Sequence, residues 1–458
     1  MKMQPLFFKA VEMLRDPFTQ ASFMLFVRIL NAWMLSPRRR YITELIISSK
    51  STQLRHFSCF HRFFSEYAWK EEELSKAHAE QQIQHFAPHD ETIDLSGDDT
   101  LCRKRGLTVY GVGMHHDPLL SSKSHVVTSW GHDWVIICLI VRKRPWASNK
   151  VWAVPLCWRL YRNLQGVTKG KKKRSAKKSS KTKKPAGHRT RPELMVEMLK
   201  QLAEWFPDRK FMISGDSAYG GRSVLQHLPS NMDLISHVHP KGAMYEPAPP
   251  RTADQLGAKR KKGARLPGMQ EWAADQSQRW KTLCFDQFGL HAVLQVKVRR
   301  ALYYKAGKDR LLIIVLVRDK EGKRPDQMFY CTNLSLTDRQ ILSCYACRWS
   351  QEVTHYNCKQ YLGFAHPANR KEKAVRRTAP MSLILYGLTV KWFDEEGYKK
   401  LEYPDRPWYP QKCAPSFADM LTTLRKETWR TNYGHLLESG SMSEKDFEEL
   451  VFFLSLAG

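Results

Sequence analysis

The stretch YACRWSQEVTHYNCKQYLGF, residues 345–364, decides how this chain is interpreted. Within it, Tyr345, Arg348, Glu352 and Lys359 follow one another in steps of three, four and seven residues. On an α-helix with about 3.6 residues per turn, these steps place all four side chains within about 60° of arc. One carboxylate would then lie in a row of groups that bind phosphate oxygens. The alternative is a solvated helix in which Arg348 simply pairs with Glu352.

Two further segments each end an apolar run with an acidic residue. In HAEQQIQHFAPHDETIDLSGDDTLCRKRG (78–106), a short strand-like run leads to Asp98 and Asp99. In DRKFMISGDSAYGGRSVLQHL (208–228), an apolar run leads to Asp216 and a glycine-rich turn before a predicted helix. An α/β fold exposes catalytic groups in this way, at the carboxyl edge of its sheet. Each segment alone is also typical of an ordinary loop.

Taken together, Asp98, Asp216 and Glu352 predict a metal centre. Hard divalent ions prefer carboxylate oxygens, and a pair of ions activates the attacking oxygen and stabilises the leaving oxygen of a phosphodiester. The expected cofactor is therefore Mg²⁺ or, alternatively, Mn²⁺, with two ions in the site. Neither GxGxxG nor GxxxxGKS occurs, so we expect no nucleotide cofactor.

The spacing Y-x-x-R-x-x-x-E-x-x-x-x-x-x-K resembles the signature helix of DDE transposases of bacterial insertion sequences. DDTLCRKRG, GMHHDPLLS and SWGHDWVII are similar to the first β-hairpin of a DDE superfamily endonuclease of this type. LISHVHPKGAMYE and KKGARLPG are similar to the segments that follow its second acid. The resemblance extends over residues 55–375.

This resemblance implies an α/β fold, with an RNase H-like mixed sheet as core, a β-rich insertion, and helical regions on both sides in the sequence. It implies that Asp98, Asp216 and Glu352 are the catalytic metal ligands, with Asp98 bridging both ions. The family's first acid usually stands as D-x-T or D-x-S, which favours Asp98 over its alternative, Asp99. The groups expected to bind DNA are Tyr345, Arg348, Lys359, Arg103, Lys104 and Arg105.

The implied activity is transposition, that is, metal-dependent cleavage of DNA at the ends of a mobile element and transfer of the freed 3′-hydroxyl into target DNA. The expected partner is double-stranded DNA, both the terminal inverted repeats and the target. A homodimer on DNA is expected because two ends have to be brought together. Two alternatives stay open: a non-catalytic DNA-binding protein derived from a transposase, and a metal-dependent nuclease that cuts without joining.

Composition agrees with a DNA substrate. The chain has 458 residues, and its 74 Lys and Arg against 45 Asp and Glu give a formal charge of +29. Such a surplus favours a polyanionic partner, although a generally basic proteome would also produce it. The longest apolar runs, 134–141 and 311–317, are too short to span a bilayer. Ten cysteines without framework spacing suit a reducing compartment, so we expect a cytoplasmic, nucleoid-associated bacterial protein.

Periodicity and composition divide the chain into five parts. Residues 1–90 have helical patterns and mix basic with aromatic residues, which predicts either a module that binds DNA ends or a cap on the core. A tract at 168–187 holds ten Lys or Arg and no acid, and it predicts a mobile loop. The expected divisions after the N-terminal region are a first part of the catalytic core at 91–239, a β-rich insertion at 240–335, a second part of the core with the signature helix at 336–395, and a C-terminal helical region at 396–458.

Overall fold

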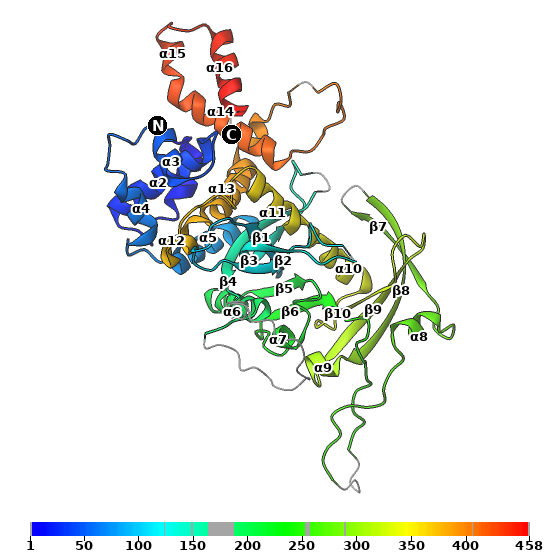
Figure 1. Cartoon of the computed structure of the whole chain (residues 1–458). Coiled ribbons are helices and arrows are strands. Elements are labelled where there is room, and N and C mark those ends of the chain that lie inside the picture. The colour runs from blue at the N-terminus through cyan, green and yellow to red at the C-terminus, as the bar shows by residue number, and fades with distance from the viewer. Residues whose placement is uncertain are drawn as a thin grey trace.

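The computed structural model describes residues 2–122, 124–147, 150–163, 187–251, 257–287, 290–404 and 406–456. The tract at 168–187, apart from Gly187, lies outside these residues, so its mobility stays a prediction. The described residues form a ten-stranded mixed sheet with helices on both faces (Figure 1). None of the helices in these ranges combines the length and the apolar character needed to cross a bilayer.

The middle of the sheet has the RNase H-like strand arrangement. β3 pairs antiparallel with both β1 and β4, whereas β5 runs parallel to β1, and β6 runs parallel to β5. The short β2 pairs antiparallel with the first residues of β3. The predicted fold class is therefore confirmed. The strands are β1 (Thr92–Arg103), β2 (Gly113–His116), β3 (Thr128–Val141), β4 (Trp152–Tyr161), β5 (Lys210–Gly215) and β6 (Met232–His237).

Helices cover both faces of this central sheet, and β3 is accordingly buried without interruption from Gly131 to Val141. Helix α6 (Arg191–Trp205) begins with a capping box, in which Thr190 and Glu193 satisfy each other's backbone amides. It packs on one face, where Met195 fills the space above a strand glycine. Helices α11 (Trp349–Gln360) and α13 (Met381–Glu395) lie on the other face.

One close approach within this sheet requires a glycine. A Cβ on Gly131, in β3, would stand 2.4 Å from the carbonyl oxygen of Cys102, in β1. Because backbone atoms cannot move aside as a flexible side chain can, Gly131→Ala should lower the free energy of unfolding by about 1–3 kcal/mol. Urea denaturation measures this change. Gly221→Ala is the control, because a Cβ there meets nothing within 4 Å; it should cost less than about 1 kcal/mol. Equal costs would contradict this explanation.

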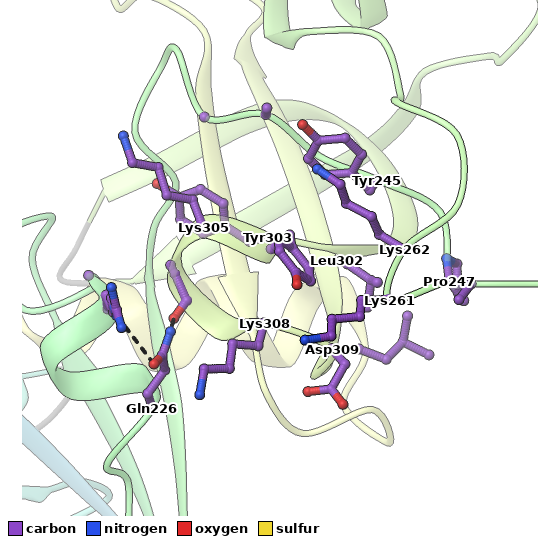
Figure 2. A pocket seen from close by; sticks show the side chains of 18 of the residues that line it. Gln226, Tyr245, Pro247, Lys261, Lys262, Leu302, Tyr303, Lys305, Lys308 and Asp309 are labelled. Atoms are coloured by element: carbon purple, nitrogen blue, oxygen red, sulfur yellow. Dashed lines mark hydrogen bonds between the residues drawn. The ribbon is translucent and has the colours of Figure 1, made fainter. Parts of the chain in front are cut away.

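The sheet continues beyond β6 into an antiparallel layer that lies within the predicted β-rich insertion. β10 pairs with β6, and the order then runs β9, β8, β7. Short helices and a long loop of this region border a cavity of about 1470 Å³ (Figure 2). Its elements are α8 (Met269–Ala274), β7 (Lys281–Gln287), β8 (Leu290–Leu302), α9 (Tyr304–Gly307), β9 (Leu311–Asp319) and β10 (Gln327–Cys331).

Helices from the two ends of the chain share one hydrophobic core with the central sheet. Trp33 donates its indole N–H to the carbonyl of Leu362, and Trp392 donates to Gln4, at 2.7 and 3.0 Å. The helices are α1 (Pro5–Glu12), α2 (Gln20–Leu35), α3 (Ile42–Ser48), α4 (Ser58–Ser65), α5 (Glu71–Phe86), α12 (Glu372–Thr378), the 3-10 helix η2 (Gly397–Lys400), α14 (Phe417–Tyr433), α15 (His435–Glu438) and α16 (Glu444–Leu456).

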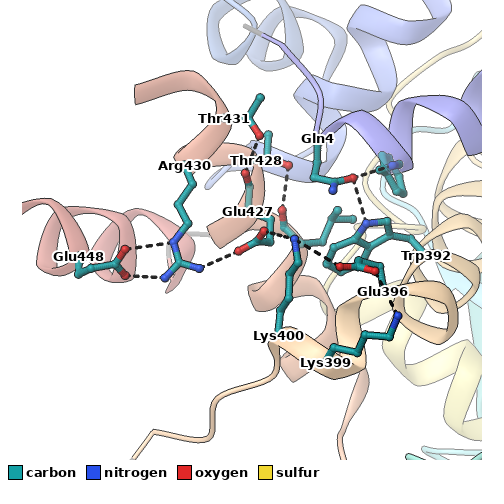
Figure 3. A network of polar contacts seen from close by, with 12 residues as sticks. Gln4, Trp392, Glu396, Lys399, Lys400, Glu427, Thr428, Arg430, Thr431 and Glu448 are labelled. Atoms are coloured by element: carbon teal, nitrogen blue, oxygen red, sulfur yellow. Dashed lines mark hydrogen bonds and ion pairs between the residues drawn. The ribbon is translucent and has the colours of Figure 1, made fainter. Parts of the chain in front are cut away.

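Ion pairs hold the last helices together. Arg430 of α14 bridges Glu427 of its own helix and Glu448 of α16, at 2.7 Å to each (Figure 3). Glu427 also accepts from Lys400, in η2, at 2.7 Å. The figure shows this network beside the contact between Trp392 and Gln4. The C-terminal helices are thus tied both to one another and to the N-terminal helices.

Candidate active site

The neighbouring acids of β1 face opposite sides of the sheet, as alternation along a strand requires. Asp98 accepts a hydrogen bond of 2.6 Å from Arg348, which stands between α10 (Asp338–Cys347) and α11. Asp99 accepts a hydrogen bond of 2.6 Å from the hydroxyl of Tyr219, and it lies 3.4 Å from Arg191 of α6. Asp98 is therefore the acid that shares a face with the signature segment.

Arg348 connects two of the three acids. Besides Asp98, its guanidinium contacts Glu352 of α11 at 3.2 Å. The side chains of Arg348 and Asp98 are only 14% and 16% exposed, whereas that of Glu352 is 38% exposed. The i,i+4 pair between Arg348 and Glu352 therefore forms, as the solvated-helix alternative also predicts. Arg348 additionally contacts the buried carboxylate of Asp98, so the pair belongs to a larger site.

The signature segment differs from the single helix that the spacing predicts, because it is interrupted at Arg348. The amide of Gln351 bonds to the carbonyl of Arg348, three residues back, at 3.0 Å. The hydroxyl of Ser350 donates a hydrogen bond of 2.7 Å to the carbonyl of Cys347. In a continuous helix, that carbonyl would accept the amide of Gln351 instead. The backbone tightens locally as a result, and the segment forms α10 and α11 in succession.

Asp216 lies beside Asp98 because of the register between two parallel strands. Gly97 of β1 is aligned with Gly215 of β5, so Asp98 and Asp216, which follow these glycines, are neighbours. The Asp216 carboxylate accepts the amide of Ala218 at 2.8 Å, and Ser236 bonds to its backbone carbonyl at 2.7 Å. These bonds hold the turn after β5 in place, with its acid next to Asp98.

The electrostatics of the site are those of crowded carboxylates. Burial, together with the charges of Asp99 and Asp216, raises the pKa of Asp98 to about 7, although Arg348 opposes the shift. Burial and the charge of Asp133 likewise raise the pKa of Asp99 to about 6. A negative charge on these acids is therefore costly unless a cation lies nearby. In the described residues, Arg348 is the cation that contacts Asp98.

The donor set fits hard divalent ions, because Asp98, Asp216 and Glu352 offer only carboxylate oxygens. Burial is the main cause of the raised pKa of Asp98, and the nearby charges of Asp99 and Asp216 add to it, so a cation beside these acids would stabilise their charged forms. Within the described ranges, however, no group of three or more His, Cys, Asp or Glu side chains is close enough to hold a metal as it stands. Arg348 occupies the position between Asp98 and Glu352 instead.

Three of the other groups expected to bind DNA, Lys359, Lys104 and Arg103, are engaged with the protein itself. Lys359 donates to the carbonyl of Leu101 at 2.8 Å, and Lys104 donates to the carbonyls of Ala365 and Pro367. Arg103 forms an ion pair with Asp117, at 2.6 Å. Arg105 is exposed. These contacts fasten β1 and α11 to their surroundings.

Tyr345 forms one wall of the site. Its ring packs edge-on against His237, at the end of β6, with the centroids 4.9 Å apart, and also against Phe329. The Arg348 guanidinium lies 5.8 Å from the Tyr345 ring centroid. Burial raises the pKa of Tyr345 to about 12, so its hydroxyl stays protonated. Burial and the charge of Arg348 lower the pKa of His237.

Sequence reasoning missed a buried polar cluster behind Asp99. Asp133, whose side chain is 1% exposed, accepts from Arg191 at 2.5 Å and lies 3.7 Å from His115. Arg191 also faces Asp99, and Tyr219 bonds to Asp99 from the other side. The sequence feature that could have indicated this cluster is Asp133 itself, an acidic residue next to the apolar run of β3. Within this cluster, Arg191 and Tyr219 both contact the Asp99 carboxylate and give it a structural role.

Two comparisons with known proteins bear on this geometry. A family model described as DDE superfamily endonuclease matches residues 14–307, which is more than half of the chain. The matched range includes Asp98, Asp99 and Asp216 and ends before Glu352. No curated protein matches the chain.

Proposed function

Because this chain belongs to the DDE superfamily endonucleases, we propose that it is a transposase that cuts DNA at the ends of a mobile element and joins the freed 3′-hydroxyl to target DNA. Membership makes DNA the substrate, and this superfamily generally uses divalent metal ions. The assignment of Mg²⁺, of two ions and of strand transfer belongs to the proposal.

One observation carries the proposal: two acids far apart in the sequence contact one arginine, and a third acid follows the strand that pairs with the strand of the first. Asp98 and Glu352 both contact Arg348, and Asp216 stands next to Asp98 across two aligned strands. In our proposal Asp98, Asp216 and Glu352 hold the ions. Bound metal would activate the attacking oxygen and stabilise the leaving oxygen.

The remaining groups then act on the substrate. Arg348 turns from the carboxylates to the scissile phosphate, for which a planar guanidinium is well suited. Tyr345 limits the range of that movement, because it is fixed by His237 and Phe329. Lys359 joins α11 to β1 through its hydrogen bond to the carbonyl of Leu101. In our proposal, its ammonium also contacts the phosphate next to the scissile bond.

The direct test is incubation of the purified protein and Mg²⁺ with a DNA that carries the inverted repeats flanking its own gene. A transposase gives 3′-ends at the repeat boundary and joined products with an unlabelled target DNA. Cleavage without joining would assign a nuclease, and specific binding without cleavage would assign a non-catalytic DNA-binding protein. Two ends have to meet for joining, so we also propose a homodimer on DNA.

We propose that the N-terminal helical region reads the DNA ends. Phe60, Phe63 and Phe64 of α4 are buried in the core, whereas Arg55 and Arg62 are exposed beside them. The region therefore caps the core and still presents a basic surface. Reading a sequence requires base contacts, and the candidate active site offers only groups suited to phosphate.

The double variant Arg55→Gln, Arg62→Gln should lose at least about thirtyfold of the preference for the native repeat over scrambled DNA, because each of the two base contacts contributes roughly 1–3 kcal/mol. Competition binding without divalent metal measures the ratio. The matched control removes two exposed lysines outside the N-terminal region, Lys320→Gln with Lys445→Gln. If both double variants change the ratio equally, the reading surface lies in another part of the chain.

A further inference from the structure

A basic cavity lies directly beside the candidate active site, with a volume of about 1470 Å³ (Figure 2). One wall is formed by the turn after Asp216 and by α7 (Arg222–Leu225), and Ser217 belongs to it. Residues from 239–248 and 259–262, between β6 and α8, form the second wall, and α9 with its flanking residues forms the third. The cavity thus begins one residue away from a proposed metal ligand.

Charge in this cavity is almost entirely positive. Eight of its lining residues are Lys or Arg, and Asp309 is the one acid among them. Lys241, Lys261 and Lys305 are exposed members of this set, and each comes from a loop or a short helix. Within the part of the chain that the structure describes, none of the eight forms an ion pair with a carboxylate. Cations gathered in a hollow focus the field on an anionic ligand.

Tyrosine rings stand among these cations. Figure 2 shows Lys305 and Lys308 on one side of Tyr303, with Lys261 and Lys262 on the other. The Lys262 ammonium lies 3.6 Å from the ring centroid of Tyr245. Tyr245 and Tyr303 are half-buried, so part of each side chain remains open to the cavity. A ligand with both phosphates and flat rings would find partners for each here.

We propose that this cavity binds a single DNA strand that leaves the active site past Asp216, an inference that rests on the proposed function. Unpaired bases can stack on tyrosines while the lysines hold the phosphates, whereas the bases of a duplex are already stacked on one another. The volume also exceeds the roughly 300–1,000 Å³ typical of a small-molecule site. Lys262 leaves the Tyr245 ring for a phosphate as a base takes its place.

The phosphate contacts are tested with the triple variant Lys241→Gln, Lys261→Gln, Lys305→Gln. Fluorescence anisotropy with a labelled single-stranded oligonucleotide, without divalent metal, gives the affinity as a function of salt. The slope of log affinity against log salt should fall by about 2, because each phosphate contact on a single strand contributes about 0.7. The matched control is Lys9→Gln, Lys320→Gln, Lys445→Gln, which removes the same charge from exposed sites elsewhere. Its slope should change by less than half as much.

The stacking contact is tested with a pair of variants at one position. Tyr245→Ala should weaken single-strand binding roughly tenfold, since stacking of a base on an aromatic ring is worth about 1–3 kcal/mol. Tyr245→Phe keeps the ring and should bind as the unmodified protein does. Thermal unfolding of both variants separates a lost contact from a damaged fold.

Two results would overturn this inference. In the first, the cavity triple and the control triple have equal salt slopes, so the cavity does not touch phosphates. In the second, the cavity variants lose as much affinity for a blunt duplex as for a single strand, so the cavity does not select unpaired DNA. Failure of the proposed function is visible separately, because a protein that never cuts DNA would still bind the single strand in this metal-free assay.

Discussion

Asp98→Asn is expected to reduce DNA cleavage by roughly 10³-fold or more, while Asp99→Asn stays within about tenfold of the unmodified protein. The two acids are adjacent in β1, yet Asp98 contacts Arg348 on the side of α11, and Asp99 contacts Tyr219 on the opposite side. The change from carboxylate to amide removes a charged metal ligand in the first variant. In the second it alters two structural contacts, the hydrogen bond from Tyr219 and the ion pair with Arg191.

Single-turnover cleavage of an end-containing DNA measures the two rates. Binding of the same DNA without metal is the internal control, and both variants should retain it, because the phosphates are held by other side chains. Asp216→Asn and Glu352→Gln should behave as Asp98→Asn does. Inactive Asp99→Asn together with active Asp98→Asn would exchange the roles of the two acids and move the centre to the α6 side of the sheet.

Arg348→Gln is expected to tighten Mg²⁺ binding by the DNA-free protein at least tenfold and, at the same time, to impair cleavage severely. In the unmodified protein, the guanidinium contacts both Asp98 and Glu352, so an incoming dication has to break charge-assisted bonds and meets a like charge. Such bonds are worth about 1.5–3 kcal/mol each. DNA removes this obstacle, because the scissile phosphate offers Arg348 another partner.

Calorimetric titration with Mg²⁺, with and without DNA, measures the two affinities. Arg142→Gln is the matched control, since Arg142 forms a similar pair with Asp94, four residues before Asp98, at 2.7 Å. It removes a half-buried Arg–Asp pair, whose acid lies on the strand of Asp98, without touching the acids of the site, so its Mg²⁺ affinity should stay unchanged. Weaker Mg²⁺ binding by Arg348→Gln than by the unmodified protein would falsify the counter-ion role of Arg348.

The sequence located core strands well where a long apolar run marks them, but it placed Asp98 and Asp99 at the end of a strand, whereas both lie within β1. The apolar run before Asp216 corresponds to β5, and the apolar run 134–141 lies in β3. β7 was missed, since KTLCFDQ has too few apolar residues to be distinguished from a loop. Short edge strands gain their stability from pairing, here with β8, which local patterns do not reveal.

The candidate site was less predictable in its details. Strand alternation shows that Asp98 and Asp99 face apart, and the D-x-T pattern favours Asp98, but the position of α11 is what shows which of the two faces the signature segment. The interruption at Arg348 depends on how the Ser350 hydroxyl competes for a backbone carbonyl. The cavity joins residues from segments near 220, 241–262 and 302–309. No local pattern connects positions so far apart in the chain.

The shared core of the first and last helices has a consequence for synthesis of the protein. Trp33 bonds to the carbonyl of Leu362, and Arg425 bonds to the carbonyl of Met34, so α2 is completed by residues translated hundreds of codons later. A growing chain on the ribosome cannot bury these helices early. It also lacks the segment that carries Glu352 until late in translation. With Glu352 in its proposed role as a metal ligand, an endonuclease of this kind would be inactive as a nascent fragment, and its activity would begin only once translation is nearly complete.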